Sequence, residues 1–200
     1  MSSTSAPSGR RERNKQEKLE RITRAASDLF AQHGVDDVTT QQIAEAADIG
    51  AGTLFLYAKT KGELLLLAQN DNYSRSLERG RVAAAEATTT LDAVLAVVTP
   101  IVECNRAQVE NGRTYLREMV FGDPAEPHHA EALSIVARTE ALITEVIADR
   151  SGVEAAQAAT LAHVVSAVQL VAMASAVDEA TTVAEVVATI RAQLEVVLPR

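Results

Sequence analysis

The sequence predicts an all-α protein of about nine helices, divided into a three-helix N-terminal domain and a larger helical C-terminal domain. Three observations predict this fold class. Apolar residues recur at spacings of three and four through most of the chain, no segment alternates as a strand would, and Gly and Pro gather at a few breaks. With 47% hydrophobic and 23% charged residues among 200, the chain can build a real core.

The first helix is expected to begin at about Asn14. Residues 1–9 are Ser, Pro and other small residues, so we predict that residues 1–13 form a disordered basic extension. Apolar residues then follow with helical spacing up to Phe30, and Gly34 supplies a C-terminal cap. The predicted boundaries are therefore 1–13 for the extension, 14–61 for the first domain and 62–200 for the second.

Two short helices separated by a tight turn are expected next. Thr39 and Gln42 have the spacing of a capping box at a helix start. The turn falls at residues 48–50, and Thr53 to Tyr57 begins the second short helix, with Leu54 as its inward anchor. Helix, tight turn and helix in this order form a helix-turn-helix, which can place the second helix in a DNA major groove. Two ordinary short helices of a bundle would also explain the apolar positions.

The rest of the chain is expected to form six longer helices. Thr60 and Glu63 repeat the capping-box spacing and open a long helix toward Ala85. Later helices are predicted over residues 91–111, 113–121, 128–150, 154–176 and 182–198, with breaks at 111–112, 122–124 and 151–152. Pro100 should kink its helix, because proline removes a backbone donor.

The charge is divided unevenly along the chain. The net charge is −8, which taken alone argues against a nucleic-acid partner. Residues 1–63 carry nine basic and nine acidic residues, whereas residues 64–200 carry ten basic and eighteen acidic ones. Within residues 10–24, seven basic residues face three acidic ones, a local net charge of +4. This segment is either a solvated tail or an arm along DNA.

The run VTTQQIAEAADIGAGTLFLYAKTKGELL resembles the N-terminal DNA-binding domain of tetracycline-repressor (TetR) regulators. The resemblance covers about residues 17–66 and rests on the Thr-Thr entry, Ile43-Ala44, Thr53-Leu54, aromatics at 55 and 57, and Lys61. The length near 200 residues and the helical C-terminal region are also typical of the family. The resemblance implies a DNA-binding first domain and a second domain that forms a homodimer and holds an inducer.

Carried over by position, the resemblance assigns nine residues to DNA. They are Thr40, Gln41, Ala51, Gly52, Thr53, Phe55, Leu56, Tyr57 and Lys61. Gln and Thr side chains can read bases or bind phosphate, and Lys61 adds its charge to a helix N-terminus. Phe55 stands where the family often has Tyr, so apolar contact replaces a hydroxyl contact. Beside a DNA-binding domain, the basic segment of residues 10–24 is better explained as an arm that contacts DNA than as a solvated tail.

The last two helices, about residues 154–176 and 182–198, are expected to join a partner's pair in a homodimer. The last carries an apolar stripe, and the one before it is rich in Ala, which permits close helix approach. Two recognition helices must also meet half-sites roughly 34 Å apart. The alternative, that both helices only close the monomer's core, can share the same surface.

A cavity for an unidentified small-molecule effector is implied by the resemblance. We chose its candidate lining residues because they are polar or polarizable on otherwise apolar helices: Cys104, Tyr115, Met119, Phe121, His163, Gln169 and Met173. Each could equally be an ordinary core residue. Neighbouring His128 and His129 point to different sides of a helix, so no metal site and no cofactor are predicted.

These features predict a sequence-specific DNA-binding regulator, a repressor that a small molecule releases from a palindromic operator. We expect no enzyme, because neither a nucleophile elbow nor a glycine-rich phosphate loop occurs. We expect the cytoplasm, because the chain has one cysteine and no signal-peptide pattern or apolar run long enough to span a membrane. The alternative is an all-helical protein-interaction module that has lost DNA binding.

Overall fold

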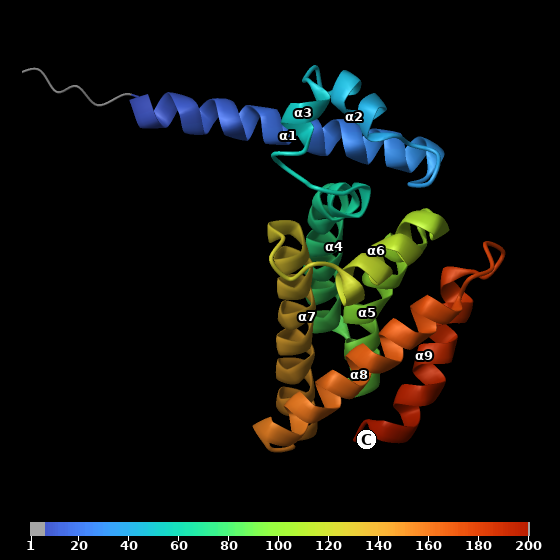
Figure 1. Cartoon of the computed structure of the whole chain (residues 1–200). Helices are drawn as coiled ribbons and strands as arrows, with labels where there is room; N and C mark the ends of the chain where they lie inside the picture. The colour runs from blue at the N-terminus through green and yellow to red at the C-terminus, as the bar shows by residue number, and fades with distance from the viewer. Residues whose placement is uncertain (1–6, 200) are drawn as a thin grey trace, which may run out of the picture.

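The computed structural model describes residues 7–199, and within that range the chain is all helix, turn and loop (Figure 1). The helices are α1 (Pro7–His33), α2 (Thr40–Ala46), α3 (Ala51–Leu54), α4 (Lys61–Glu86), α5 (Thr90–Arg106), α6 (Val109–Phe121), α7 (Pro127–Ser151), α8 (Ala155–Ser175) and α9 (Val183–Val197). The predicted all-α class and the nine helices are confirmed for this part of the chain.

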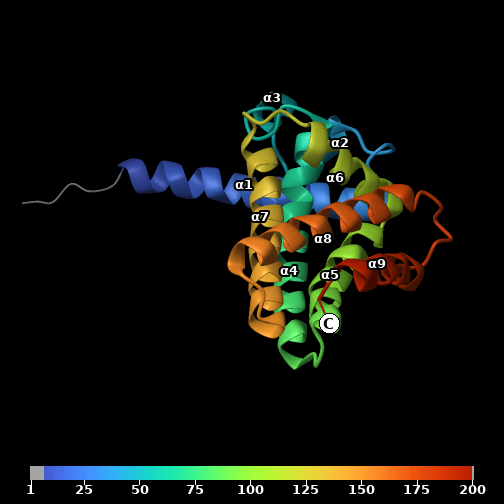
Figure 2. The ribbon, with the colours of Figure 1, turned by 90° about the horizontal axis from the view of Figure 1, so that it is seen from below.

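The long helix α4 joins the two halves of the molecule. Its N-terminal end packs under α1, and along its length it packs against α5, α6 and α7. Helices α1, α2 and α3 form a cap over this end, while α8 packs against α7 and α9 along one side (Figure 1). Seen from below, the first turns of α1 project well beyond the rest of the molecule (Figure 2).

Helix α1 begins earlier than the sequence predicted. Residues 7–13 continue the helix that was expected to start at about Asn14, so they are not an irregular extension. Residues 1–6 lie outside the described residues. The segment from Arg10 has no apolar face to bury, but it is rich in long polar side chains. Such side chains have a high helix propensity, so they can extend a helix that follows directly in the chain. Gly34 ends the helix as predicted, with a φ of 77° and its N–H bonded to the Phe30 carbonyl oxygen at 3.0 Å.

The predicted break at Asn111-Gly112 is wrong. The chain breaks at residues 107–108 instead, where Gln108 caps α6 by accepting the Asn111 N–H, and both predicted break residues lie inside α6. Gly112 is needed for close packing, because a Cβ there would collide with the Asn105 carbonyl oxygen. Tight contact between α5 and α6, which the sequence pattern does not encode, therefore explains this glycine. Helix α5 continues through Pro100 to Arg106.

Helix α8 is the only described helix whose length and hydropathy would suffice to cross a membrane. Its most apolar window has a mean hydropathy of 1.6, and 28% of that window is buried in the chain. This is weak evidence for a membrane segment, because helices of soluble proteins pass the same test. An exposed apolar face of this kind is nevertheless typical of a surface that binds a partner.

Candidate nucleic-acid interface and ligand cavity

The first helix of the helix-turn-helix is held by a complete capping box. The Gln42 N–H donates to Thr39 Oγ1 at 3.2 Å, and the Thr39 N–H donates to Gln42 Oε1 at 2.7 Å. Ile43 and Ala44 on the opposite side are fully buried. The cap thus fixes where α2 starts, and the buried pair fixes which face it turns inward.

The turn between α2 and α3 depends on Asp48. This residue has a φ of 51°, the left-handed conformation that Asp tolerates better than most side chains. The Ile49 N–H then donates to the Ala44 carbonyl oxygen at 3.0 Å, and Gly50 is the N-cap of α3. Arg21 of α1 approaches Asp48 at 3.3 Å, so α1 also contacts this turn.

Helix α3 is a single turn, but the helical path continues beyond it. Leu54 is fully buried and anchors the helix as predicted. After it, the N–H groups of Tyr57 and Ala58 both donate to the Leu54 carbonyl oxygen, at 2.9 and 3.2 Å. Phe55 and Leu56 project outward, with 46% and 83% of their surface exposed. Two large apolar side chains are thereby presented to solvent beside a short recognition helix.

The structure brings the nine predicted DNA-binding residues together on α2, α3, the following turn and the first residue of α4. Four are exposed, namely Gln41, Gly52, Phe55 and Leu56, and five are half-buried, namely Thr40, Ala51, Thr53, Tyr57 and Lys61. The Gln41 amide donates to Glu45 at 2.7 Å, which orients it along α2. Their contact with DNA stays a prediction.

Two of these side chains also contact the protein's own backbone. Lys61 Nζ donates to the carbonyl oxygens of Asp36 and Val38, at 3.1 and 3.2 Å, and so holds the loop between α1 and α2. The Tyr57 hydroxyl donates to the Lys15 carbonyl oxygen at 3.4 Å, a long bond. One ammonium proton of Lys61 is left for a phosphate, because an ammonium group has three.

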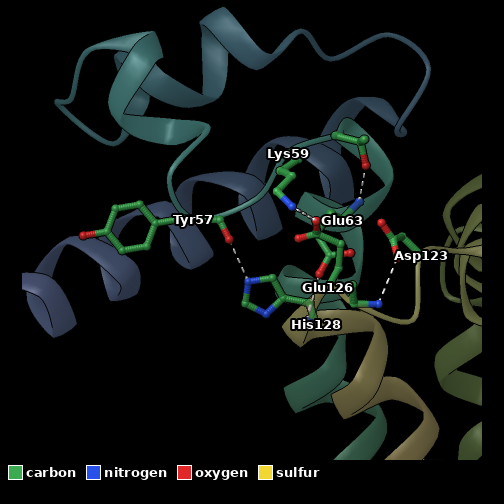
Figure 3. A network of polar contacts seen from close by, with 8 residues as sticks. Tyr57, Lys59, Glu63, Asp123, Glu126 and His128 are labelled. Carbon is green, nitrogen blue, oxygen red and sulfur yellow. Dashed lines mark hydrogen bonds and ion pairs between the residues drawn. The ribbon is translucent and has the colours of Figure 1, made fainter.

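A polar cluster that the sequence did not predict joins the recognition turn to the start of α7 (Figure 3). His128 Nε2 lies 3.0 Å from the Tyr57 carbonyl oxygen, and the His128 N–H donates to Glu63 Oε1 at 2.8 Å. Lys59 forms an ion pair with the buried Glu126. The end of the helix-turn-helix is thus bonded directly to the second domain.

Glu63 therefore does not complete the capping box expected at the start of α4. Thr60 Oγ1 does accept the Glu63 N–H at 3.0 Å, but the Glu63 carboxylate turns away to α7. Burial raises the pKa of Glu63, an effect that the His128 N–H partly offsets. A sequence carries little sign of this role, since the spacing of Thr60 and Glu63 is that of a local cap.

Helix α6 makes a second connection between the domains. Glu110 Oε1 accepts the Asp36 N–H at 2.7 Å, and Asn111 Nδ2 donates to the Phe30 carbonyl oxygen at 2.8 Å. Both partners lie near the end of α1, where the chain turns toward α2. The first turn of α6 therefore grips the first domain.

A cavity of about 360 Å³ lies in the second domain between α6, α7 and α8. Five of the seven residues predicted to bind a ligand line it, namely Tyr115, Met119, His163, Gln169 and Met173. Much of the remaining lining is apolar, including Ile101, Leu116, Ile135 and Leu170. Its volume and composition are typical of a small-molecule site.

The other two predicted lining residues do not reach this cavity. Phe121 is the last residue of α6. Its side chain lies on the outward face of the helix and is 83% exposed. Cys104 lines a separate, more polar hollow of about 560 Å³ beside Arg75 and Arg79. Burial raises the pKa of the Cys104 thiol, which disfavours the reactive thiolate.

Two stacked tyrosines separate the hollow from the cavity, and each lines both. The rings of Tyr73 and Tyr115 are 4.1 Å apart between centroids and 19° from parallel. The Tyr115 hydroxyl donates to Asn70 at 2.8 Å, and the Tyr73 hydroxyl accepts from Asn105 at 3.0 Å. Burial raises the pKa of both phenols, which therefore stay protonated.

Metal ligation has no cluster to support it in residues 7–199, where no group of three or more His, Cys, Asp or Glu side chains converges. His129 illustrates the reason. Its Nε2 lies 3.1 Å from the Met119 carbonyl oxygen and 4% of the residue is exposed, whereas the neighbouring His128 bonds to Tyr57 and Glu63.

The structure thus combines a helix-turn-helix with a helical second domain that holds an apolar cavity. Residues 22–68 match the family model described as bacterial regulatory proteins, tetR family. The N-terminal part of the chain is therefore similar to the DNA-binding domain of this family. No curated protein sequence matches the chain significantly.

Solved structures share the fold over nearly the whole chain. A TetR transcriptional regulator from Rhodococcus sp. RHA1 has a TM-score of 0.67 and 16% identity, covering 92% of this chain and 96% of its own. FadR from Thermus thermophilus, in complex with lauroyl-CoA, has a TM-score of 0.62 and 23% identity, covering 91% and 96%. FadR from Bacillus subtilis, in complex with stearoyl-CoA, has a TM-score of 0.60 and 15% identity, covering 90% and 97%.

Proposed function

We propose that the protein is a cytoplasmic repressor that binds a palindromic operator as a homodimer and leaves it when a small molecule fills the cavity between α6, α7 and α8. The observation that carries this proposal is the pairing, in one chain, of a tetR-family helix-turn-helix with that cavity. The proposal assigns regulation and no catalytic activity.

The mechanism is a shift between two conformations, one of which fits the operator. An effector changes this equilibrium only through a difference in its affinity for the two. Helices α6 and α7 both line the cavity and both bond to the first domain, α6 through Glu110 and Asn111, and α7 through His128. A ligand that displaces either helix therefore disturbs the position of the recognition turn.

Homodimerisation through α8 and α9 is supported by an unusual exposed face. On α8 the exposed small or apolar residues Ala159, Ala167, Val171 and Ala174 follow one another at spacings of eight, four and three. Val196 of α9 is 84% exposed. Small and apolar residues on one helix face let a second copy approach closely, as in a four-helix interface.

The test is fluorescence anisotropy with DNA taken from upstream of the protein's own gene. We expect saturable binding that weakens steeply with salt, because Lys and Arg displace counterions from phosphates. Substrates of the products of neighbouring genes then serve as candidate effectors, and one of them should release the DNA. Absence of salt-sensitive binding to any promoter fragment would favour the protein-interaction module instead.

A further inference from the structure

Most polar groups that line the cavity between α6, α7 and α8 are occupied by other parts of the protein. The tyrosine hydroxyls bond to Asn70 and Asn105, and the Thr139 hydroxyl donates to the Ile135 carbonyl oxygen at 2.9 Å. Glu140 Oε1 and His163 Nδ1 are paired at 3.0 Å. These groups therefore have partners before any ligand arrives.

Ser166 and Gln169 differ, since neither side chain has a hydrogen-bond partner among the side chains and backbone of residues 9–199, and of the two only Gln169 is buried. The residue is only 5% exposed and faces the cavity. Its amide atoms are not fully enclosed by protein, because the enclosed side-chain atoms without a partner in this range are Asn111 Oδ1 and His129 Nδ1, so the Gln169 amide can bond to water or to a ligand in the cavity. Gln169 thus marks the position of a polar group in whatever occupies the cavity.

Three polar residues of α8 share the face that lines this cavity. His163, Ser166 and Gln169 are three residues apart, so they lie along one side of the helix. The His163 side chain is 79% exposed and marks the open end, while Gln169 is buried. Across from them, Leu116 and Met119 of α6 and Ile135 of α7 supply an apolar wall.

The charge of the lining opposes an anionic ligand. Glu140 is the one carboxylate among the lining residues, which include no Lys or Arg. An anion placed here would meet a like charge without a permanent cation to compensate. An uncharged molecule avoids that cost.

We propose that the cavity takes an uncharged amphipathic molecule, whose apolar body lies against α6 and α7 and whose carbonyl or amide group bonds to Gln169. Gln169 is then the residue that selects for the polar group, and Glu140 is the one that excludes anions. The proposal rests on the ligand-responsive function proposed above. It also separates this cavity from one for acyl-CoA, a ligand class named for two similar structures.

The experiment is isothermal titration of the full chain with decanamide, decanoate and decanoyl-CoA. We expect decanamide to bind at least tenfold more tightly than the other two. Gln169→Leu should weaken decanamide binding about tenfold, the effect of one buried hydrogen bond, without improving decanoate binding. Gln157→Leu, at an exposed position of the same helix, is the matched control and should bind as the original chain does.

A second variant provides a test that does not depend on whether Gln169→Leu folds. Glu140→Gln lies near the open end, and it should raise decanoate affinity more than decanamide affinity. Tighter binding of decanoate or decanoyl-CoA than of decanamide, unchanged decanamide binding in Gln169→Leu, or binding of none of the three would overturn the proposed ligand class. DNA binding of the ligand-free protein is measured separately. It tests the proposed function independently of the titrations.

Discussion

Lys61 and Glu63 show how single residues in the first turn of α4 serve the junction between the domains. Lys61 was assigned to phosphate and also bonds two carbonyl groups of the loop before α2. Glu63 was assigned to a local cap and instead accepts an N–H of α7. The family resemblance gave the assignment of Lys61 and sequence spacing gave that of Glu63, whereas their partners come from segments that are 23 to 65 positions away.

Tyr57→Phe and Lys61→Ala should both weaken operator binding while leaving the dimer intact. They should differ in stability. Loss of the two Lys61 bonds should lower the free energy of unfolding by about 1–2 kcal/mol, whereas Tyr57→Phe removes a single long bond and should change it by less than about 0.5 kcal/mol. Anisotropy, thermal unfolding and sedimentation check the three quantities. Full operator affinity in both variants would contradict their assignment to DNA.

Glu63→Gln should change the pH dependence of stability. The folded protein keeps the Glu63 proton to a higher pH than the unfolded chain, because burial raises the pKa above the ordinary value near 4.5. Protonation of Glu63 therefore contributes fully to the free energy of unfolding below about pH 4.5, and this contribution is lost as the pH rises through the raised pKa. Gln has no such proton and can still accept the His128 N–H.

Chemical denaturation from pH 4.5 to 8 tests this expectation. The variant should gain stability relative to the original chain as the pH rises across the window. Curves that run parallel over the whole range would show that Glu63 titrates alike in the folded and unfolded states.

At the scale of elements, most helices follow local signals. The predicted capping box of α2 is present, Gly34 ends α1 as predicted, and the starts and ends of α7, α8 and α9 fall within one residue of the prediction. The failures are α1, which starts earlier, and the break between α5 and α6, which the pattern placed at Gly112. A glycine marks a turn or a close approach equally well, and only packing distinguishes the two.

The helical form of residues 7–13 sharpens the prediction for the basic segment. A straight helix cannot follow a minor groove as an irregular arm does, so we expect phosphate contacts along its exposed side. Deletion of residues 1–15 should weaken operator binding and flatten its salt dependence.

Replacement of Arg10, Arg11 and Arg13 with Gln should reduce the salt slope by about one for each arginine that binds a phosphate.

Arg81→Gln is the matched control, because Arg81 is an exposed arginine on α4 in the second domain. It should leave both affinity and salt slope unchanged. The idea of a DNA-binding α1 fails if the triple variant keeps the slope of the original chain.

At the scale of the whole molecule, the unpaired apolar face of α8 and α9 predicts a dimer. Val171→Glu and Val196→Glu place charges at positions that are 62% and 84% exposed in the single chain. Together they should convert the dimer to a monomer and weaken operator binding at least tenfold, because only a dimer joins two half-sites.

Val82→Glu provides the control, since this valine is 54% exposed on α4, away from that face. Sedimentation velocity should show the control as a dimer and the double variant as a monomer. A double variant that remains dimeric would place the interface elsewhere.

The sequence by itself determined the all-α class, the helix-turn-helix and the division of charge, because caps, turns and apolar periodicity act over a few residues. It also identified five of the residues that line the cavity, since polar or polarizable side chains on apolar helices are few. Tertiary structure alone decided that Phe121 faces solvent, that Cys104 lies behind the tyrosine pair and that Glu63 bonds to α7. These depend on which helix faces lie opposite one another, and that is set by the packing of segments far apart in the chain.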